Sequence, residues 1–156
     1  MVNQDFRDLF AEFNARDVDF LVVGAYALAF HGHVRATKDL DVWVRPESEN
    51  ARRVFRSLQA YGAPTGELTE DDFAHPDLTF QIGVAPIRID VLSSIDGVEF
   101  ATAWEHRSES TYGDQRIFVI SREDLLHNKR TAARLQDLAD VEALEALGDK
   151  APPNSA

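Results

Sequence analysis

The feature that most restricts the fold of this chain is a pair of acids, Asp39 and Asp41, inside an otherwise apolar segment. The segment 39–44 reads Asp-Leu-Asp-Val-Trp-Val, an alternation that predicts a β-strand. Side chains two residues apart in a strand share a face and lie about 6.6 Å apart along it. The two carboxylates therefore project together, and they are costly on such a strand unless a cation neutralises them.

A third acid and a glycine extend this pattern. Asp90 interrupts the apolar run 87–92, which also predicts a strand. If the two strands are neighbours, three carboxylates converge and can hold two metal ions about 4 Å apart. Mg²⁺ is the natural candidate, because it binds one or two carboxylates together with substrate phosphates. Gly24 ends the apolar run 18–23 before a predicted helix at 26–31, where a residue without a side chain lets a phosphate approach the backbone.

Each acid also has a plainer interpretation. An Asp-x-Asp pair is common at exposed strand edges and in turns. Asp90 could simply pair with Arg88, which stands two residues earlier on the same strand face. A glycine at the end of a strand most often makes a turn. The joint placement of the three acids after a strand–Gly–helix unit favours a functional site.

The remaining segments predict an α+β fold, with one small mixed β-sheet flanked by helices. Helical spacing is present at 3–16, at 47–60 and from Ser121, a predicted N-cap, to Leu147. Strands are expected at 79–84 and 87–92, joined by Ala85 and Pro86, and at 109–112 and 115–120, with a turn at Gly113–Asp114. The segment 61–76 is predicted to be a loop. We expect a single domain over residues 1–148 and a disordered tail over 149–156.

Charge and composition limit the possible partners. The chain carries 27 acidic against 16 basic residues, a formal charge of −11, so that it would repel nucleic acid unless it has a local basic patch. It contains no cysteine, which excludes disulfides and thiolate metal sites. No apolar stretch approaches the roughly 20 residues of a membrane helix, and the N-terminus does not read as a signal peptide. We therefore expect a cytoplasmic location and no membrane partner.

A longer pattern resembles a known family. The run Phe20-Leu-Val-Val-Gly-Ala-Tyr-Ala-Leu-Ala-Phe-His-Gly32, followed by Arg35-Ala-Thr-Lys-Asp-Leu-Asp41, is similar to the signature of minimal nucleotidyltransferases of the DNA polymerase beta-like superfamily. In that superfamily a Gly-Ser or Gly-Gly step precedes an Asp-x-Asp strand, and a third Asp lies on a later strand. The similarity continues through 100–107, 120–129 and 134–141. It covers most of 18–147 and looks like the stand-alone bacterial proteins related to the MNT and AbiEii toxin groups.

The resemblance implies a polymerase beta-like fold with C-terminal helices, and a Mg²⁺-dependent activity. A nucleoside monophosphate would pass from an NTP to a hydroxyl acceptor, which could be a tRNA end, a protein or a small molecule. Asp39 and Asp41 would bind two Mg²⁺ ions and the triphosphate. Asp90 would complete the metal site and help to activate the attacking hydroxyl. The backbone at Gly24 and Ala25 would cradle the β- and γ-phosphates.

The basic residues allow two interpretations. Arg35 and Lys38 flank the acids and could meet phosphate or form salt bridges with the same acids. Lys129 and Arg134, on the last predicted helices, could reach the triphosphate or pair with Asp137 or Asp140.

One residue departs from the family pattern, because position 25 is Ala where Ser or a second Gly is common. Ala25 removes a hydroxyl that would contact phosphate but leaves the backbone amides in place. This departure keeps a second hypothesis open, in which the chain is a catalytically weak binding module with a protein partner, for example in a toxin–antitoxin pair. A metal-dependent phosphohydrolase is a third alternative, which the Gly24 unit disfavours.

Overall fold

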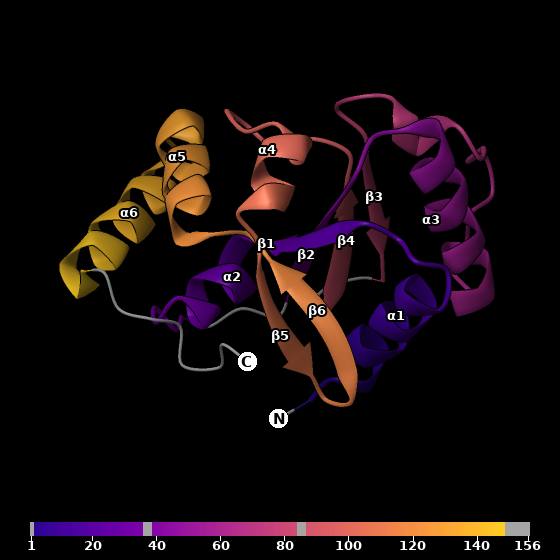
Figure 1. Ribbon diagram of the computed structural model, residues 1–156, viewed down its shortest axis with the longest axis horizontal. Helices are drawn as coiled ribbons and strands as arrows, with labels where there is room; N and C mark the ends of the chain where they lie inside the picture. The colour runs from indigo at the N-terminus through magenta and orange to yellow at the C-terminus, as the bar shows by residue number, and fades with distance from the viewer. Residues whose placement is uncertain (1, 36–38, 84–86, 149–156) are drawn as a thin grey trace.

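The computed structural model describes residues 2–35, 39–83 and 87–148, which form a mixed six-stranded sheet with helices on both sides (Figure 1). The strand order is β3-β4-β2-β1-β6-β5. The strands are β1 (Phe20–Val23), β2 (Asp39–Val44), β3 (Thr79–Ile82), β4 (Arg88–Leu92), β5 (Ser108–Tyr112) and β6 (Gln115–Val119). The pairs β2–β4 and β1–β6 are parallel, and the others are antiparallel. The expected α+β fold with a mixed sheet is confirmed.

The helices form two groups (Figure 1). On one side of the sheet lie α1 (Gln4–Ala15) and α3 (Ser48–Tyr61), and on the other lie α2 (Gly24–Phe30), α4 (Phe100–Glu105), α5 (Arg122–Ala132) and α6 (Leu135–Leu147). A 3-10 turn, η1 (Asp72–Ala74), lies in the loop between α3 and β3. The Ser121 side chain accepts a hydrogen bond from the Asp124 amide, as the predicted N-cap of α5 requires.

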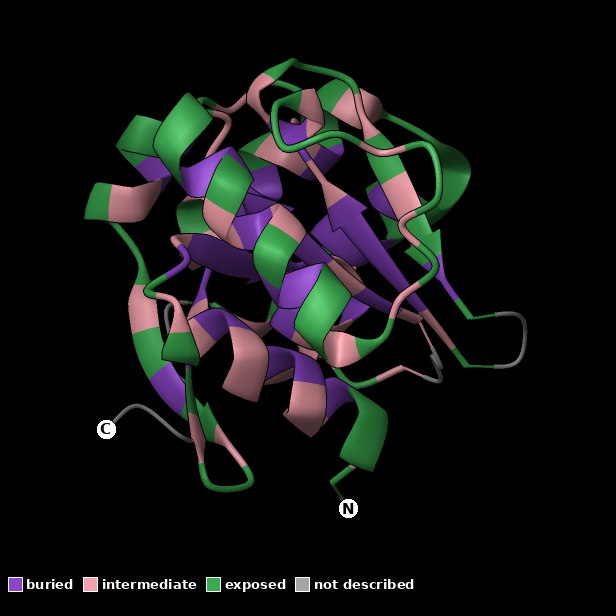
Figure 2. Cartoon of the chain, turned by 90° about the vertical axis from the view of Figure 1, so that its right-hand side faces the viewer, coloured by how far each residue is buried: buried purple, intermediate pink, exposed green. Residues whose placement is uncertain are grey.

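The sheet face toward α1 is apolar. Phe20 of β1 pairs with Val44 of β2 and stacks on Phe10 of α1, with 5.7 Å between ring centroids. Alternate residues of a strand share a face, so Leu40 and Val42 point to the same side as Val44. All five side chains are buried, and Figure 2 shows the buried residues along the sheet and the inner sides of the helices. These side chains form part of the hydrophobic core.

The opposite sheet face carries polar residues beside an aromatic cluster. Asp39, Asp41 and Trp43 share this face of β2 by the same alternation. Trp43 is buried, as expected for a core residue, and contacts Phe100 of α4 edge-on at 5.0 Å between centroids. The core therefore begins immediately next to the two acids.

Three differences between the structure and the sequence-based expectation concern the helices. Helix α2 begins at Gly24 rather than at Tyr26. Helix α4 was not predicted, because its six residues are too few to reveal a helical period. The final helical region breaks at Ala133, which adopts a left-handed conformation (φ 55°) without a glycine or proline to mark it.

Two sequence expectations fall outside the described residues, namely the turn at Ala85–Pro86 and the tail 149–156. The helices of the described part are all too short or too polar to cross a lipid bilayer.

Candidate active site

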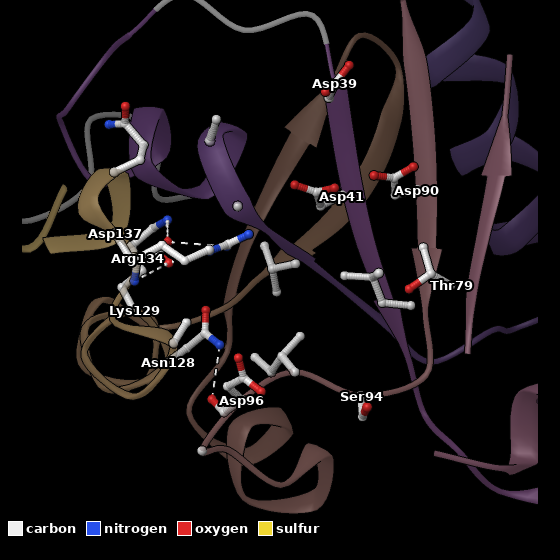
Figure 3. A pocket seen from close by; sticks show the side chains of 18 of the residues that line it. Asp39, Asp41, Thr79, Asp90, Ser94, Asp96, Asn128, Lys129, Arg134 and Asp137 are labelled. Atoms are coloured by element: carbon white, nitrogen blue, oxygen red, sulfur yellow. Dashed lines mark hydrogen bonds and ion pairs between the residues drawn. The ribbon is translucent and has the colours of Figure 1, made fainter. Parts of the chain in front are cut away.

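Two of the three predicted acids meet at the centre of the sheet. The parallel register of β2 and β4 places Asp41 opposite Asp90 and Asp39 opposite Arg88. In Figure 3 the carboxylates of Asp41 and Asp90 point toward each other, whereas Asp39 lies further along β2 and points away from them. Oδ2 of Asp39 instead accepts a hydrogen bond from Nη2 of Arg88 at 3.2 Å. The convergence expected for three acids is therefore found for two.

Arg88 is also in contact with Asp90, as the plainer interpretation of that acid requires. Its Nε lies 3.2 Å from Oδ1 of Asp90. Within residues 2–35, 39–83 and 87–148, no three His, Asp or Glu side chains are arranged to hold a metal ion as they stand. The Arg88 guanidinium contacts both Asp39 and Asp90.

The Asp41 carboxyl has a strongly raised pKa. Burial raises the pKa of Asp41 from 3.8 to about 6, with the charges of Asp90 and Asp39 and a hydrogen bond to Asp90 acting in the same direction, while the charge of Arg88 opposes them. Oδ1 of Asp90 is buried and has no hydrogen-bond partner. Arg88 therefore does not fully offset the burial of Asp41 and the charges of its two neighbouring acids, a condition that favours binding of a proton or a metal cation.

Gly24 is required by the position of Asp41. Gly24 has a φ of +66°, and a Cβ built on it would overlap the Asp41 carboxylate and lie 3.1 Å from its Cγ. The sequence predicted that the glycine leaves room for a phosphate. The structure shows that Asp41 itself fills the space beside the Gly24 Cα, so that this glycine seats a site carboxylate.

Gly24→Ala is expected to damage both the fold and the site. Left-handed backbone costs an L-residue about 1–2 kcal/mol, and the added methyl group also has to displace Asp41. The matched control is Gly62→Ala, since Gly62 has a φ of +94° and no atom within 4 Å of its virtual Cβ. Denaturant unfolding should show a loss of about 1 kcal/mol for Gly62→Ala and a larger loss for Gly24→Ala. Equal losses for the two variants would contradict the role assigned to Gly24.

An open cavity of about 940 Å³ lies over the acids. Its floor is formed by the β1–α2 junction, β2 and β4, one wall by the segment after β4, and the other wall by the corner between α5 and α6 (Figure 3). Gly24, Ala25, Arg35, Asp39, Asp41, Asp90 and Lys129 all line it. Every described residue that the sequence put forward for the site therefore belongs to one cavity.

Lys129 is buried within an ionic cluster rather than extended into the cavity. Its Nζ lies 3.3 Å from Oδ1 of Asp137 and 3.0 Å from Oδ2 of Asp140, and only 7% of its side chain is exposed. Burial alone would raise the pKa of Asp140, but hydrogen bonds from Lys129 and Gln136 and the charge of Lys129 outweigh it, and the pKa lies below its usual range. Of the two interpretations of Lys129, the ion pair is the one present.

Arg35 belongs to the same cluster. Its Nε lies 3.1 Å from Oδ1 of Asp140, whereas the sequence had suggested salt bridges to Asp39 and Asp41. This contact ties the chain segment before β2 to α6, across 105 positions of sequence. Lys38, the other predicted cation, lies outside the described residues.

A family comparison agrees with the fold. The family described as nucleotidyltransferase of unknown function (DUF6036) matches residues 1–149. The chain belongs to this family. The expected membership of the polymerase beta-like superfamily is thereby confirmed.

Solved structures share the fold of this DUF6036 chain at low sequence identity. Lincomycin-bound LnuA, a lincosamide antibiotic adenylyltransferase, has a TM-score of 0.59 and 16% identity, covering 94% of this chain and 98% of its own. The antibiotic-resistance factor ANT(2'')-Ia has a TM-score of 0.60 and 15% identity, covering 93% and 83%. An antigenic nucleotidyltransferase-like protein from Paracoccidioides brasiliensis has a TM-score of 0.52 and 15% identity, covering 93% and 75%. No curated protein matches the chain.

The cavity has an exposed cation in Arg134, for which the sequence left two interpretations open. Arg134, the N-cap residue of α6, has 79% of its side chain exposed, and its Nε donates to Oδ2 of Asp137 at 2.7 Å. In Figure 3 its side chain extends from the helix corner over the cavity toward β2. The predicted pairing with Asp137 is therefore present, and the exposed guanidinium also faces the cavity.

Proposed function

We propose that this protein is a Mg²⁺-dependent nucleotidyltransferase that moves a nucleoside monophosphate from an NTP to a hydroxyl group of a small molecule. The observation that carries the proposal is the Asp41–Asp90 carboxyl pair, brought together by the β2–β4 register on the floor of the cavity. Membership of a nucleotidyltransferase family supports the same reaction.

The chemistry of the acids fits a divalent cation. Carboxylate oxygens are the ligands that Mg²⁺ prefers, and the raised pKa of Asp41 indicates that the single guanidinium of Arg88 does not fully compensate the negative charge of the three acids. Asp39, Asp41 and Asp90 would hold two Mg²⁺ ions, with Asp39 leaving Arg88 to do so. The bound metal would neutralise the triphosphate and lower the pKa of the acceptor hydroxyl.

Residues of the chain would orient the reactants. The backbone at Gly24 and Ala25 lies beside the acids and would meet the β- and γ-phosphates. The acceptor oxygen would form a bond to the α-phosphorus while the bond from that phosphorus to the bridging oxygen breaks, and pyrophosphate leaves with the electron pair. The hydroxyl proton would pass to the Asp90 carboxylate.

A small acceptor is favoured over nucleic acid. The described cavity lining contains six aspartates, namely Asp39, Asp41, Asp77, Asp90, Asp96 and Asp137, against three arginines and one lysine. The whole chain carries a formal charge of −11, which opposes the approach of a polyanion. LnuA, which shares the fold, has a lincomycin-bound structure, and this is a precedent for a small-molecule partner.

The second candidate is a nucleotidyltransferase-like binding module with a protein partner, as in a toxin–antitoxin pair. Two observations favour it: Ala25 in place of a serine or second glycine, and the Arg88 guanidinium lodged between Asp39 and Asp90. Such a module would retain the acids without binding nucleotide.

Calorimetric titration with ATP, GTP, CTP and UTP, each with and without Mg²⁺, distinguishes the two candidates. Mg²⁺-dependent binding of a nucleotide is expected for the enzyme, and a preference for one base would identify the donor. The absence of binding with all four nucleotides would contradict the enzyme and favour the binding module.

Arg134→Gln is expected to weaken NTP binding about tenfold, since a hydrogen bond to a charged group contributes about 1.5–3 kcal/mol. The exposed guanidinium would meet the triphosphate, whereas Lys129 is held by Asp137 and Asp140. Arg52→Gln is the matched control, because it removes the same charge from α3, on the other side of the sheet. The two variants are compared by titration with the Mg²⁺–NTP complex, and equal affinities for both would exclude Arg134 from the nucleotide site.

A further inference from the structure

Arg88 occupies an unusual position for a cation, inside the acid cluster of the proposed metal site. It stands opposite Asp39 and two residues before Asp90, so that its side chain shares their face of the sheet. Its Nη2 lies 3.2 Å from Oδ2 of Asp39, and its Nε lies 3.2 Å from Oδ1 of Asp90. One guanidinium thus bridges two of the three carboxylates of the proposed metal site.

The contact between Arg88 and Asp90 is poorly formed as a hydrogen bond. Nε of Arg88 and Oδ1 of Asp90 are both buried, and neither has a hydrogen-bond partner despite their proximity. The second contact, from Nη2 to Oδ2 of Asp90, is 3.5 Å long. Well-formed pairs between guanidinium and carboxylate groups have N–O distances of about 2.7–2.9 Å, as in the two 2.8 Å bonds from Arg7 to Asp114. Attraction between charges, rather than hydrogen-bond geometry, therefore holds Arg88 against Asp90.

Arg88 is also partly exposed to the cavity. About a third of its side chain (34%) is exposed, and it lines the cavity in which a triphosphate would lie. A cation that loses two carboxylates to a metal ion needs another anion, and the phosphates of the nucleotide would supply one. Arg88 would then stabilise the same region before and after the metal binds, through different partners.

We propose that Arg88 is an internal counter-ion of the metal site, which a divalent cation must displace from Asp39 and Asp90 and which then binds the nucleotide phosphates. This inference rests on the proposed function. Arg88 then has opposite effects on two binding equilibria. It weakens binding of the metal ion alone, because it competes for the carboxylates, and it strengthens binding of the metal–nucleotide complex.

Arg88→Gln tests the proposal by the sign of these two effects. The first measurement uses Mn²⁺ alone at pH 7.5, with the free ion detected by electron paramagnetic resonance. Arg88→Gln should bind Mn²⁺ about tenfold more tightly than the wild type, within the 5–150-fold range of ordinary couplings between sites. Calorimetry with the Mg²⁺–nucleotide complex should show weaker binding by a similar factor. Arg88→Lys, which keeps the charge but cannot bridge two carboxylates, should lie between the wild type and Arg88→Gln in both measurements. Arg116→Gln, on β6, should match the wild type in both.

The possible outcomes separate the inference from the proposed function. A merely structural role for Arg88 would weaken both equilibria, and this result, or an unchanged affinity for Mn²⁺, would overturn the inference while leaving the enzyme intact. If Arg88→Gln does not fold, the affinities of Arg88→Lys for Mn²⁺ and for the Mg²⁺–nucleotide complex, which should change in opposite directions, provide the test. A wild type that binds neither Mn²⁺ nor the Mg²⁺–nucleotide complex would overturn the proposed function, and the inference with it.

Discussion

Lys129→Met is expected to lower the free energy of unfolding by about 3–5 kcal/mol, because removing one member of a buried ion pair leaves its partners charged and unpaired. Lys129 lies between Asp137 and Asp140, whose side chains are 4% and 0% exposed. Arg134 and Arg35 would still contact these acids, but from the outer side of the cluster, with side chains 79% and 31% exposed. Urea denaturation at pH 7 measures the loss.

Arg130→Met is the control for this substitution. Arg130 is the next residue of α5 and pairs with Glu145, but both side chains are about half exposed. Exposed pairs contribute about 0–1 kcal/mol, so this variant should be nearly as stable as the wild type. Comparable losses of unfolding free energy for Lys129→Met and Arg130→Met would show that burial of the ionic cluster does not determine how much the cluster stabilises the fold.

The effect of Lys129→Met should also depend on pH. The pKa values of Asp137 and Asp140 are lowered, so the stability that these acids gain from their ion pairs is fully present above their ordinary pKa of 3.8. It is lost as the pH falls through their folded-state values below 3.8. The difference between wild type and variant should therefore be full at pH 7 and should shrink below about pH 4.

Asp41→Asn is expected to abolish Mg²⁺-dependent nucleotide binding and, at the same time, to stabilise the fold. Even the outer-shell partners of metal ligands contribute about 10–100-fold to metal affinity, so the loss of a ligand should weaken binding about 100-fold or more. Removing the carboxylate also removes its unfavourable burial beside Asp90. A pKa raised from 3.8 to about 6 corresponds to about 3 kcal/mol at most at pH 7.

The pH dependence of the wild type follows from the same raised pKa. The folded protein keeps the Asp41 proton up to about pH 6, whereas the unfolded chain loses it near 3.8. The folded state therefore binds more protons in this interval, and the contribution of Asp41 lowers stability as the pH rises from about 4 to 6. Asp41→Asn should lack this decrease, and thermal unfolding between pH 4 and 7 compares the two proteins.

Asp96→Asn is the matched control for Asp41→Asn. Asp96 lines the same cavity and the substitution changes the charge equally, but its side chain is exposed and lies outside β2 and β4. We expect its stability to change by less than about 0.5 kcal/mol and its nucleotide affinity to stay close to that of the wild type. An Asp41→Asn variant that binds the Mg²⁺–nucleotide complex as tightly as Asp96→Asn would exclude Asp41 from a metal site.

The sequence predicted those parts of the fold that depend on local patterns. The alternation in 39–44 gave the bounds of β2 as the structure has them, and Ser121 correctly marked the start of α5. The turn at Gly113–Asp114 lies between β5 and β6 as expected. Each of these features is encoded within a few neighbouring residues, so that periodicity and capping chemistry suffice to find it.

The parts that the sequence did not predict depend on contacts between distant residues. The partner of Arg35 is Asp140, and no local pattern connects two positions 105 residues apart. The placement of Arg88 between Asp39 and Asp90 requires the parallel register of β2 and β4, which follows from the whole sheet. Likewise, the need for glycine at position 24 becomes visible only when Asp41 is seen beside it.

The parallel register of β2 and β4 also determines when the site can appear during folding. β3 and β4 form an antiparallel pair that is close in sequence, but Asp41 and Asp90 meet only after the chain has closed a loop of about 50 residues between them. Contacts of high sequence separation form slowly and cooperatively with the rest of a sheet. Neither strand carries the carboxyl pair by itself, so a fragment that ends before β4 has no such pair. The acidic centre is thus a property of the completed sheet, and a divalent cation that binds there would distinguish finished molecules from partly folded ones.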